Sequence, residues 1–423
     1  MTTTTSTKSF IQSNDDIAAI SSPLTRQHQL DWLRVFALSL LIVYHTAMVF
    51  VANWGFHFKS EHQSETLQYF MLIVEPWRMA SLWFISGVAL QTAFSKYTIS
   101  QLLAKRSFQL LLPLLVGVLI IVPPQLYVEM TTKSGLDISF FAFMHEFFKP
   151  DSDIFSEYQA GIWPHIDVNH LWYLRSLWQY SLVIILLSPV LNNEWLVNHL
   201  TRLVAQNPLF LAIVCYIPLV ALQFLLDGED KRYVSGFLFL LYGFFAARLP
   251  MLWQSLADNL VKIASFALVN LLVMLCCYHL TFHANSTTDD AWLIALRLSY
   301  SLAKLLGLLT MLAFASRFFA HRSATISTLN EAVYPCYLLH QTFIVVFAWL
   351  LSNYALHVSV HFLLIVLFTT LACALSIFLI KRHNVLRLCF GMPVKSPVSP
   401  VYTWTFYPLA VLGCIIIGAE ILF

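Results

Sequence analysis

An apolar run of bilayer length near the N-terminus carries two ionisable side chains that could do chemistry, Arg34 and His45. They are eleven positions apart within residues 30–50, LDWLRVFALSLLIVYHTAMVF. On a helix they share one face, about 16 Å apart along the axis. A histidine within the hydrocarbon span is costly, faces the bundle interior and is a functional candidate. A basic residue near a helix end is often a snorkelling anchor, so Arg34 is either an anchor or a partner in the chemistry.

Further candidates share one property, a titratable or polar aromatic side chain in or beside another apolar run. They are Glu75, Arg78, Lys105, Arg106, His170, Trp172, Arg175, Glu331, Tyr337 and His340. Glu75 and Arg78 are three positions apart, so they can form an ion pair on one helix. Lys105 and Arg106 precede an apolar run, where a basic pair is most often a topology signal.

The residue types favour some reactions and disfavour others. The chain has neither a nucleophilic serine in a G-x-S-x-G context nor an H-E-x-x-H pair, which disfavours classical hydrolase and zinc sites. A histidine suffices as general base for attack by a hydroxyl on an activated acyl group. Arginines can hold phosphates or a carboxylate through forked hydrogen bonds. The same residues could equally form the relay of an anion or proton-coupled transporter, and spacing leaves both hypotheses open.

Composition indicates an integral membrane protein. Hydrophobic residues make up 59% of the 423 residues and charged residues 11%, against roughly 25% charged in ordinary soluble domains. No basic stripe with interleaved aromatics is present, so we expect no nucleic acid partner. The seven cysteines lack zinc-type spacing, so no metal site is expected. The pattern predicts an all-α, polytopic helical bundle in the lipid bilayer.

Apolar windows of about 20 residues place the transmembrane helices. We expect ten to eleven spans, at about 31–52, 69–94, 108–126, 170–190, 208–226, 233–248, 262–282, 292–315, 333–352, 358–380 and 403–423. Residues 1–28 are expected to form a disordered cytoplasmic leader. Residues 391–423 are expected to add a linker and an extra C-terminal helix to the core. In the second span, FISG (Phe84–Gly87) supplies small residues that suit close helix packing.

Loop charge predicts the orientation. Lysine and arginine gather in alternate loops, around residues 96–106, 202, 248–262, 317–322 and 381–395, and such loops are usually cytoplasmic. The N-terminus is then cytoplasmic, and the acidic, aromatic-rich segment 127–168 lies outside the cytoplasm. We expect this segment to form an ordered cap whose aromatic side chains contact the substrate.

Five stretches, taken in order, resemble the membrane-bound acyltransferase family 3, and within it the glucan biosynthesis protein C branch. They are LDWLRVFALSLLIVYH, EPWRMASLWFISG, AKRSFQLLLPLL, NHLWYLRSL and NEAVYPCYLLHQ. One position departs from the pattern, because many relatives carry an arginine where this chain has Gln109. The handling of donor phosphates is then expected to differ, or to depend more on Lys105 and Arg106.

The resemblance implies a function and roles for the candidates. The transmembrane acyltransferase domain would cover residues 29–390, in the inner membrane of a bacterium. His45 would be the catalytic base and Arg34 its essential partner. Arg78, Lys105 and Arg106 would hold the acyl donor, an acyl-CoA carrying a succinyl or acetyl group. The remaining candidates, with His170 and His340, would surround the cavity in which an extracytoplasmic glycan accepts the acyl group. No permanently bound cofactor is expected.

Overall fold

The computed structural model describes residues 28–149, 152–156, 167–206, 208–283 and 290–393. The expected leader (1–28) lies outside this range except for its last residue, and so does the expected last span (403–423). The first elements are α2 (His28–Phe50), α3 (Thr66–Leu72), α4 (Glu75–Phe94), α5 (Ile99–Val116), the π-helical turn η1 (Gly117–Ile121), α6 (Pro123–Lys133), α7 (Phe140–Phe147) and the 3-10 turns η2 (Asp153–Phe155) and η3 (Asn169–Leu171). They are followed by α8 (Trp172–Leu191), α9 (Glu194–Gln206), α10 (Pro208–Leu225), α11 (Gly228–Ala246), α12 (Pro250–Asp258), α13 (Leu260–Phe282), α14 (Asp290–Phe318), α15 (Ala324–Ser352), α16 (Val358–Ile380) and α17 (Asn384–Cys389).

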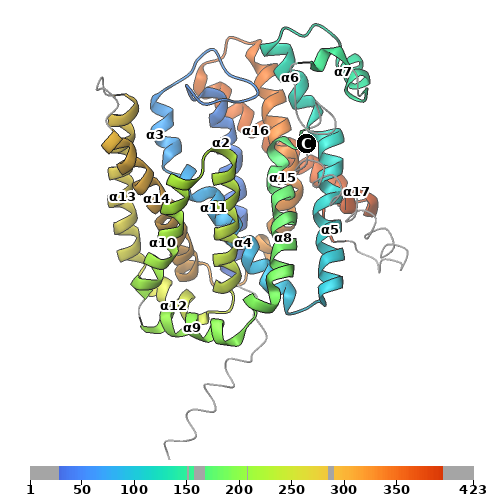
Figure 1. Cartoon of the computed structure of the whole chain (residues 1–423). Helices are drawn as coiled ribbons and strands as arrows, with labels where there is room; N and C mark the ends of the chain where they lie inside the picture. Colours follow the sequence, from blue (N-terminus) through green and yellow to red (C-terminus); the bar gives the residue numbers. More distant parts are fainter. Residues whose placement is uncertain (1–27, 150–151, 157–166, 207, 284–289, 394–423) are drawn as a thin grey trace, which may run out of the picture.

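The long helices run side by side between two ends of the molecule (Figure 1). Helices α6 and α7 lie at one end, and α9 and α12 lie at the other. Within the described residues, seven helical segments are long and apolar enough to cross a membrane, and up to nine if each of two bent pairs is one span. The prediction of an all-α, polytopic membrane bundle is confirmed.

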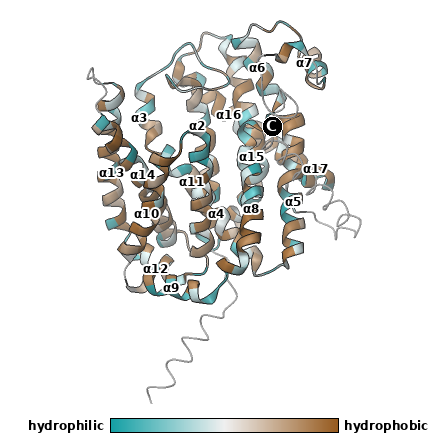
Figure 2. Ribbon diagram, in the orientation of Figure 1, coloured by the Kyte–Doolittle hydropathy of each residue, from teal (hydrophilic) through white to brown (hydrophobic). Residues whose placement is uncertain are grey.

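The long helices are rich in apolar residues, which Figure 2 shows as brown ribbon. On α16, four exposed leucines recur every four residues: Leu363, Leu367, Leu371 and Leu375. Only 28% of the apolar window of this helix is buried inside the protein. Such a stripe would be unfavourable in water, and it suits contact with lipid chains.

The span expected at 69–94 is divided into α3 and α4, and α4 is not among the helices apolar enough to cross a membrane. Polar residues explain this result, because Glu75, Arg78 and Gln91 all lie on α4. This helix is held inside the protein, where its main neighbour is α11. Polar side chains on it can therefore face protein groups or a cavity in place of lipid.

Two glycines allow α4 and α11 to cross closely. A Cβ atom on Gly87 would collide with the backbone oxygen of Leu240, and it would approach the backbone nitrogen of Phe244 to 2.7 Å. A Cβ atom on Gly243 would collide in the same way with the backbone oxygen of Phe84. The close packing expected from FISG is present, since both contacts involve its end residues, Phe84 and Gly87.

The third span is longer than expected. Helix continues from Ile99 to Lys133 over 35 residues, whereas the sequence predicted a span at 108–126. The Pro123-Pro124 pair does not end it, because η1 changes the hydrogen-bond register just before the pair. There the backbone nitrogen of Val122 donates to the oxygen of Gly117 at 2.9 Å, the i to i+5 bond of a π-helical turn. Residues 127–133, which were expected to belong to the cap, are therefore the end of this long helix.

Several aromatic side chains of segment 127–168, which were expected to contact the substrate, are instead buried. Phe143, Phe147 and Phe155 are buried with Met130 in a small core of their own. They cover apolar surface and are not available to stack on a substrate, although Phe141 remains 85% exposed. Residues 150–151 and 157–166, including the GIWPH stretch, lie outside the described range.

We predict that Gly87→Ala and Gly243→Ala each destabilise the bundle by about 1–3 kcal/mol or more, because the added methyl group meets backbone atoms that cannot move aside. Thermal unfolding in detergent would measure the loss. Gly55→Ala is the matched control, since a Cβ atom there has no neighbour within 4 Å. Equal melting temperatures for all three variants would contradict the close crossing of α4 and α11.

Candidate active site

A cavity of about 980 Å³ opens between the helices. The predicted site residues that line it are His45, Glu75, Arg78, His170, Trp172, Arg175 and Tyr337. They come from the regions expected to be the first, second, fourth and ninth spans, so the fold brings together residues that are far apart in the sequence. The volume of this cavity is in the range of small-molecule binding sites.

His45 is held by a second histidine. Nδ1 of His45 lies 2.9 Å from Nε2 of His340, and the two rings are nearly parallel, with centroids 5.1 Å apart. His340 is fully buried and does not line the cavity, in contrast to the expectation. It lies behind His45, where it can orient the ring.

The hydrogen bonds determine which nitrogen of each ring carries the proton. Nδ1 of His340 lies 2.7 Å from the backbone oxygen of Tyr337, and a carbonyl oxygen can only accept, so this nitrogen donates. In neutral His340, Nε2 must then accept, and Nδ1 of His45 must donate to it. The lone pair of neutral His45 is thereby left on Nε2, the unprotonated nitrogen that a general base needs.

Glu75 and Arg78 do not form the ion pair that the sequence predicted. Glu75 accepts a hydrogen bond from the Tyr300 hydroxyl at 2.5 Å. The Arg78 guanidinium lies over the Tyr44 ring, 4.0 Å from its centroid. Arg78 is only 8% exposed, and its Nε has no hydrogen-bond partner among the described residues. A buried cation facing a cavity without a carboxylate partner is suited to an anionic ligand.

Two more arginines lie beside aromatic rings in the cavity wall. Arg175 donates to the Tyr233 hydroxyl at 2.6 Å. Arg232 lies over the Trp172 ring, 4.1 Å from its centroid, and forms an ion pair with Glu229. Because these guanidinium groups are occupied by protein partners, they shape the wall around Trp172.

Besides His340, four predicted site residues do not line the cavity: Arg34, Lys105, Arg106 and Glu331. Arg34 forms an ion pair with Asp31 at 3.1 Å, and Lys105 donates to the Tyr97 hydroxyl at 2.5 Å. Glu331 is half exposed and lies 3.3 Å from Lys381, outside the wall of the cavity. Arg106 makes no hydrogen bond or ion pair with any described residue.

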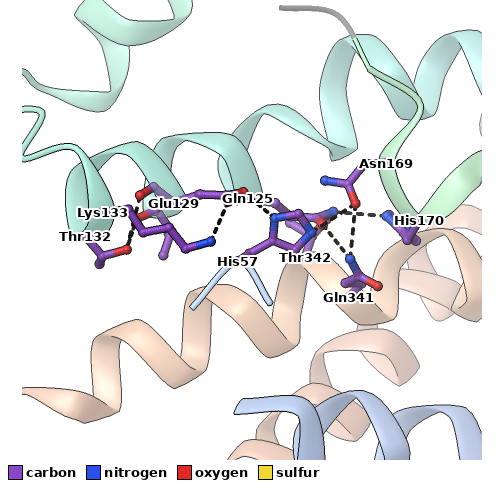
Figure 3. Close-up of polar contacts among 10 residues, drawn as sticks. His57, Gln125, Glu129, Thr132, Lys133, Asn169, His170, Gln341 and Thr342 are labelled. Carbon is purple, nitrogen blue, oxygen red and sulfur yellow. Dashed lines mark hydrogen bonds and ion pairs between the residues drawn. The ribbon is translucent and has the colours of Figure 1, made fainter. Parts of the chain in front are cut away.

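Among the cavity-wall residues that sequence reasoning missed, four are joined by hydrogen bonds: His57, Glu129, Asn169 and Gln341. Nδ1 of His57 lies 2.5 Å from Glu129, and Nε2 lies 3.0 Å from Asn169 (Figure 3). His57 and Glu129 were assigned to loops outside the bundle, and Asn169 and Gln341 carry no charge. The only indication in the sequence was that Asn169 and Gln341 adjoin two predicted site residues, His170 and His340.

The loop that carries His57 is tied to the end of α2. The Lys59 ammonium donates to the backbone oxygens of Met48 and Val51. The backbone nitrogen of Ser64 donates to the backbone oxygen of Phe50 at 2.8 Å. Lys59 thus satisfies carbonyl groups that the helix end leaves open. Burial, and the neighbouring ammonium of Lys133, lower the pKa of Lys59 from its ordinary value.

Comparison with models of known protein families identifies the family of the chain. The acyltransferase 3 family model, described as an acyltransferase domain, matches residues 27–380. The chain belongs to the acyltransferase 3 family. Comparisons with curated proteins and with solved structures found no match. The protein is therefore a membrane acyltransferase, and the narrower glucan branch rests on the sequence resemblance alone.

The geometry places an imidazole, that of His45, and a cation, that of Arg78, in the wall of one cavity. Nε2 of His45 can take a proton from a hydroxyl group, and Arg78 can hold an anion beside it. No three histidine, cysteine, aspartate or glutamate side chains of the described ranges are grouped so that they could hold a metal ion. The chemistry that the cavity offers directly is acid–base catalysis with anion binding.

We predict that His340 supports His45 through its acceptor nitrogen. His340→Phe keeps a buried ring but removes the acceptor, so we expect kcat to fall by about tenfold to hundredfold with little change in KM. His340→Gln keeps an acceptor oxygen near the position of Nε2 and should retain most of the activity. Equal losses in both variants, measured by acyl transfer, would show that only the packing of His340 matters.

Proposed function

We propose that the protein is an O-acyltransferase that moves a succinyl or acetyl group from cytoplasmic acyl-CoA to a hydroxyl of an extracytoplasmic glycan. One observation carries the choice of base: Nδ1 of His45 must donate to His340, which leaves Nε2 as a lone-pair nitrogen in a residue lining the cavity. The acyl-CoA donor and the glycan acceptor follow from the sequence resemblance.

In the proposed reaction the acceptor hydroxyl gives its proton to Nε2 of His45. Its oxygen attacks the thioester carbonyl carbon and forms a tetrahedral intermediate. The carbon–sulfur bond then breaks, and the thiolate takes the proton from the His45 imidazolium. During these steps Nδ1 of His45 continues to donate to His340, so the ring keeps one orientation while its charge changes.

The acyl donor is proposed to enter from the opposite end of α2. Arg34 lies about 16 Å along the helix from His45, and the basic loops at that end are expected to be cytoplasmic. Arg34, Lys105 and Arg106 are candidates for the phosphates of the donor. Arg78 is the candidate for the free carboxylate of a succinyl group, whereas an acetyl group brings no anion to it.

We predict that purified protein supplied with succinyl-CoA or acetyl-CoA and a gluco-oligosaccharide releases free thiol. His45→Ala should lower this rate by about 10²–10⁴-fold, the usual contribution of a general base, while the protein remains folded in detergent. Retained activity would remove His45 as the base. Absence of thiol release by folded wild type with either donor would favour a transporter of organic anions, the alternative class.

We predict the orientation in the inner membrane of a bacterium from the same charge pattern. A cysteine introduced at Ser134, after α6, should react with an impermeant thiol reagent added outside intact cells, whereas one introduced at Ser100, at the start of α5, should not. Both side chains are exposed, so accessibility is matched. The reverse labelling pattern would show that the N-terminus is not cytoplasmic.

A further inference from the structure

A network of hydrogen bonds runs through the wall of the cavity. Backbone carbonyl groups, which can only accept, determine which atom of each side chain donates and which accepts. The Thr342 hydroxyl donates to the backbone oxygen of Ile121 at 2.7 Å, so its oxygen accepts from Nε2 of Gln125 at 2.6 Å. Nε2 of His170 donates to the backbone oxygen of Leu338 at 3.0 Å, so its Nδ1 also accepts from Gln125. Both contacts require the Gln125 amide nitrogen, and Oε1 of Gln125 is left as an acceptor.

The same logic fixes the next side chains in turn (Figure 3). Because Oε1 of Gln125 accepts, Nε2 of Gln341 donates to it at 3.2 Å. The same nitrogen lies 3.3 Å from Asn169, whose facing atom must therefore be the oxygen Oδ1. That oxygen accepts from Nε2 of His57, and the other ring nitrogen of His57 faces the Glu129 carboxylate. Both ring nitrogens of His57 therefore have protein partners.

The network leaves two amide atoms without a partner in the part of the chain that the structure describes. Nδ2 of Asn169 and Oε1 of Gln341 make no hydrogen bond with any described residue, yet both side chains line the cavity. Gln341 is only 4% exposed, and a buried amide without a full set of partners is unfavourable unless a ligand or water supplies them. Asn169 has a left-handed backbone, with φ of 48°, which costs energy in a residue other than glycine.

These two amides are placed beside the histidines of the site by the chain itself. Gln341 follows His340, which holds the base, and Asn169 precedes His170, whose ring lies 5.7 Å from the ring of His340. In each pair the histidine hydrogen-bonds to protein backbone while the amide faces the cavity. A ligand bound by the amides is therefore held in a fixed relation to His45.

We propose that Asn169 and Gln341 form the subsite for the acceptor and bind hydroxyl groups next to the hydroxyl that reacts. One amide offers a donor and the other an acceptor, and hydroxyl groups of a polyol such as a sugar can both donate and accept. A single hydroxyl on an alkyl chain cannot pair with both amides while it also reacts. The subsite thus selects acceptors with neighbouring hydroxyls, and it rests on the proposed acyl transfer.

The test compares two acceptors, a gluco-oligosaccharide and 1-propanol, with wild type and two variants. Asn169→Gly removes one amide and suits the left-handed backbone, and Gln341→Met removes the other at similar volume. Each should raise KM for the oligosaccharide by about tenfold per lost hydrogen bond and leave transfer to 1-propanol unchanged. Thr342→Val is the matched control, because it alters the network behind the wall and should affect both acceptors alike.

Three results would overturn the subsite. The first is that the amide variants lose transfer to both acceptors equally. The second is that the amide variants transfer to both acceptors as wild type does. The third concerns binding, followed by tryptophan fluorescence because Trp172 lines the cavity. If the variants bind the oligosaccharide as wild type does, the subsite is wrong. Weaker binding by the variants together with absence of thiol release by wild type would instead remove the proposed function and keep the subsite.

Discussion

The constraint on which the site depends is that polar groups inside a membrane bundle must find hydrogen-bond partners within the protein. Backbone carbonyl groups can only accept, so each one that contacts a side chain determines the direction of the next hydrogen bond. Three carbonyls, of Ile121, Tyr337 and Leu338, are enough to orient the side chains that lead to His45 and to Gln341. In water, exchange with solvent would weaken this control.

The helix packing explains why such groups can gather without facing lipid. Helix α4 carries Glu75 and Arg78, and the close crossing at Gly87 and Gly243 holds it against α11 inside the bundle. Helix α2 can then present His45 and Tyr44 to the same cavity. The apolar stripe on α16 adds to the separation, because it gives the lipid a surface of leucine side chains.

The sequence predicted the class of fold and several of the residues that line the cavity, for reasons that can be traced to particular residues. An intramembrane histidine such as His45 is conspicuous because apolar neighbours surround it. Its partner His340 is 295 positions away, and helical periodicity says which residues share a face of one helix but not which helices meet. Neutral amides such as Gln341 give no signal of charge. The π-helical turn before Pro123 was hidden because prolines usually end a helix.

The separation of charges along α2 bears on how two substrates could meet in the proposed reaction. Arg34 lies in the second turn of α2 and pairs with Asp31 in the first turn, whereas His45 lies near the opposite end of the helix. A phosphorylated donor would lose much hydration if its charges entered the bundle. If the basic residues hold those phosphate charges at one end, only the acyl thioester has to reach His45, with Arg78 available for the carboxylate of a succinyl group. A glycan can then remain at the other end, so neither polar substrate needs to cross the membrane.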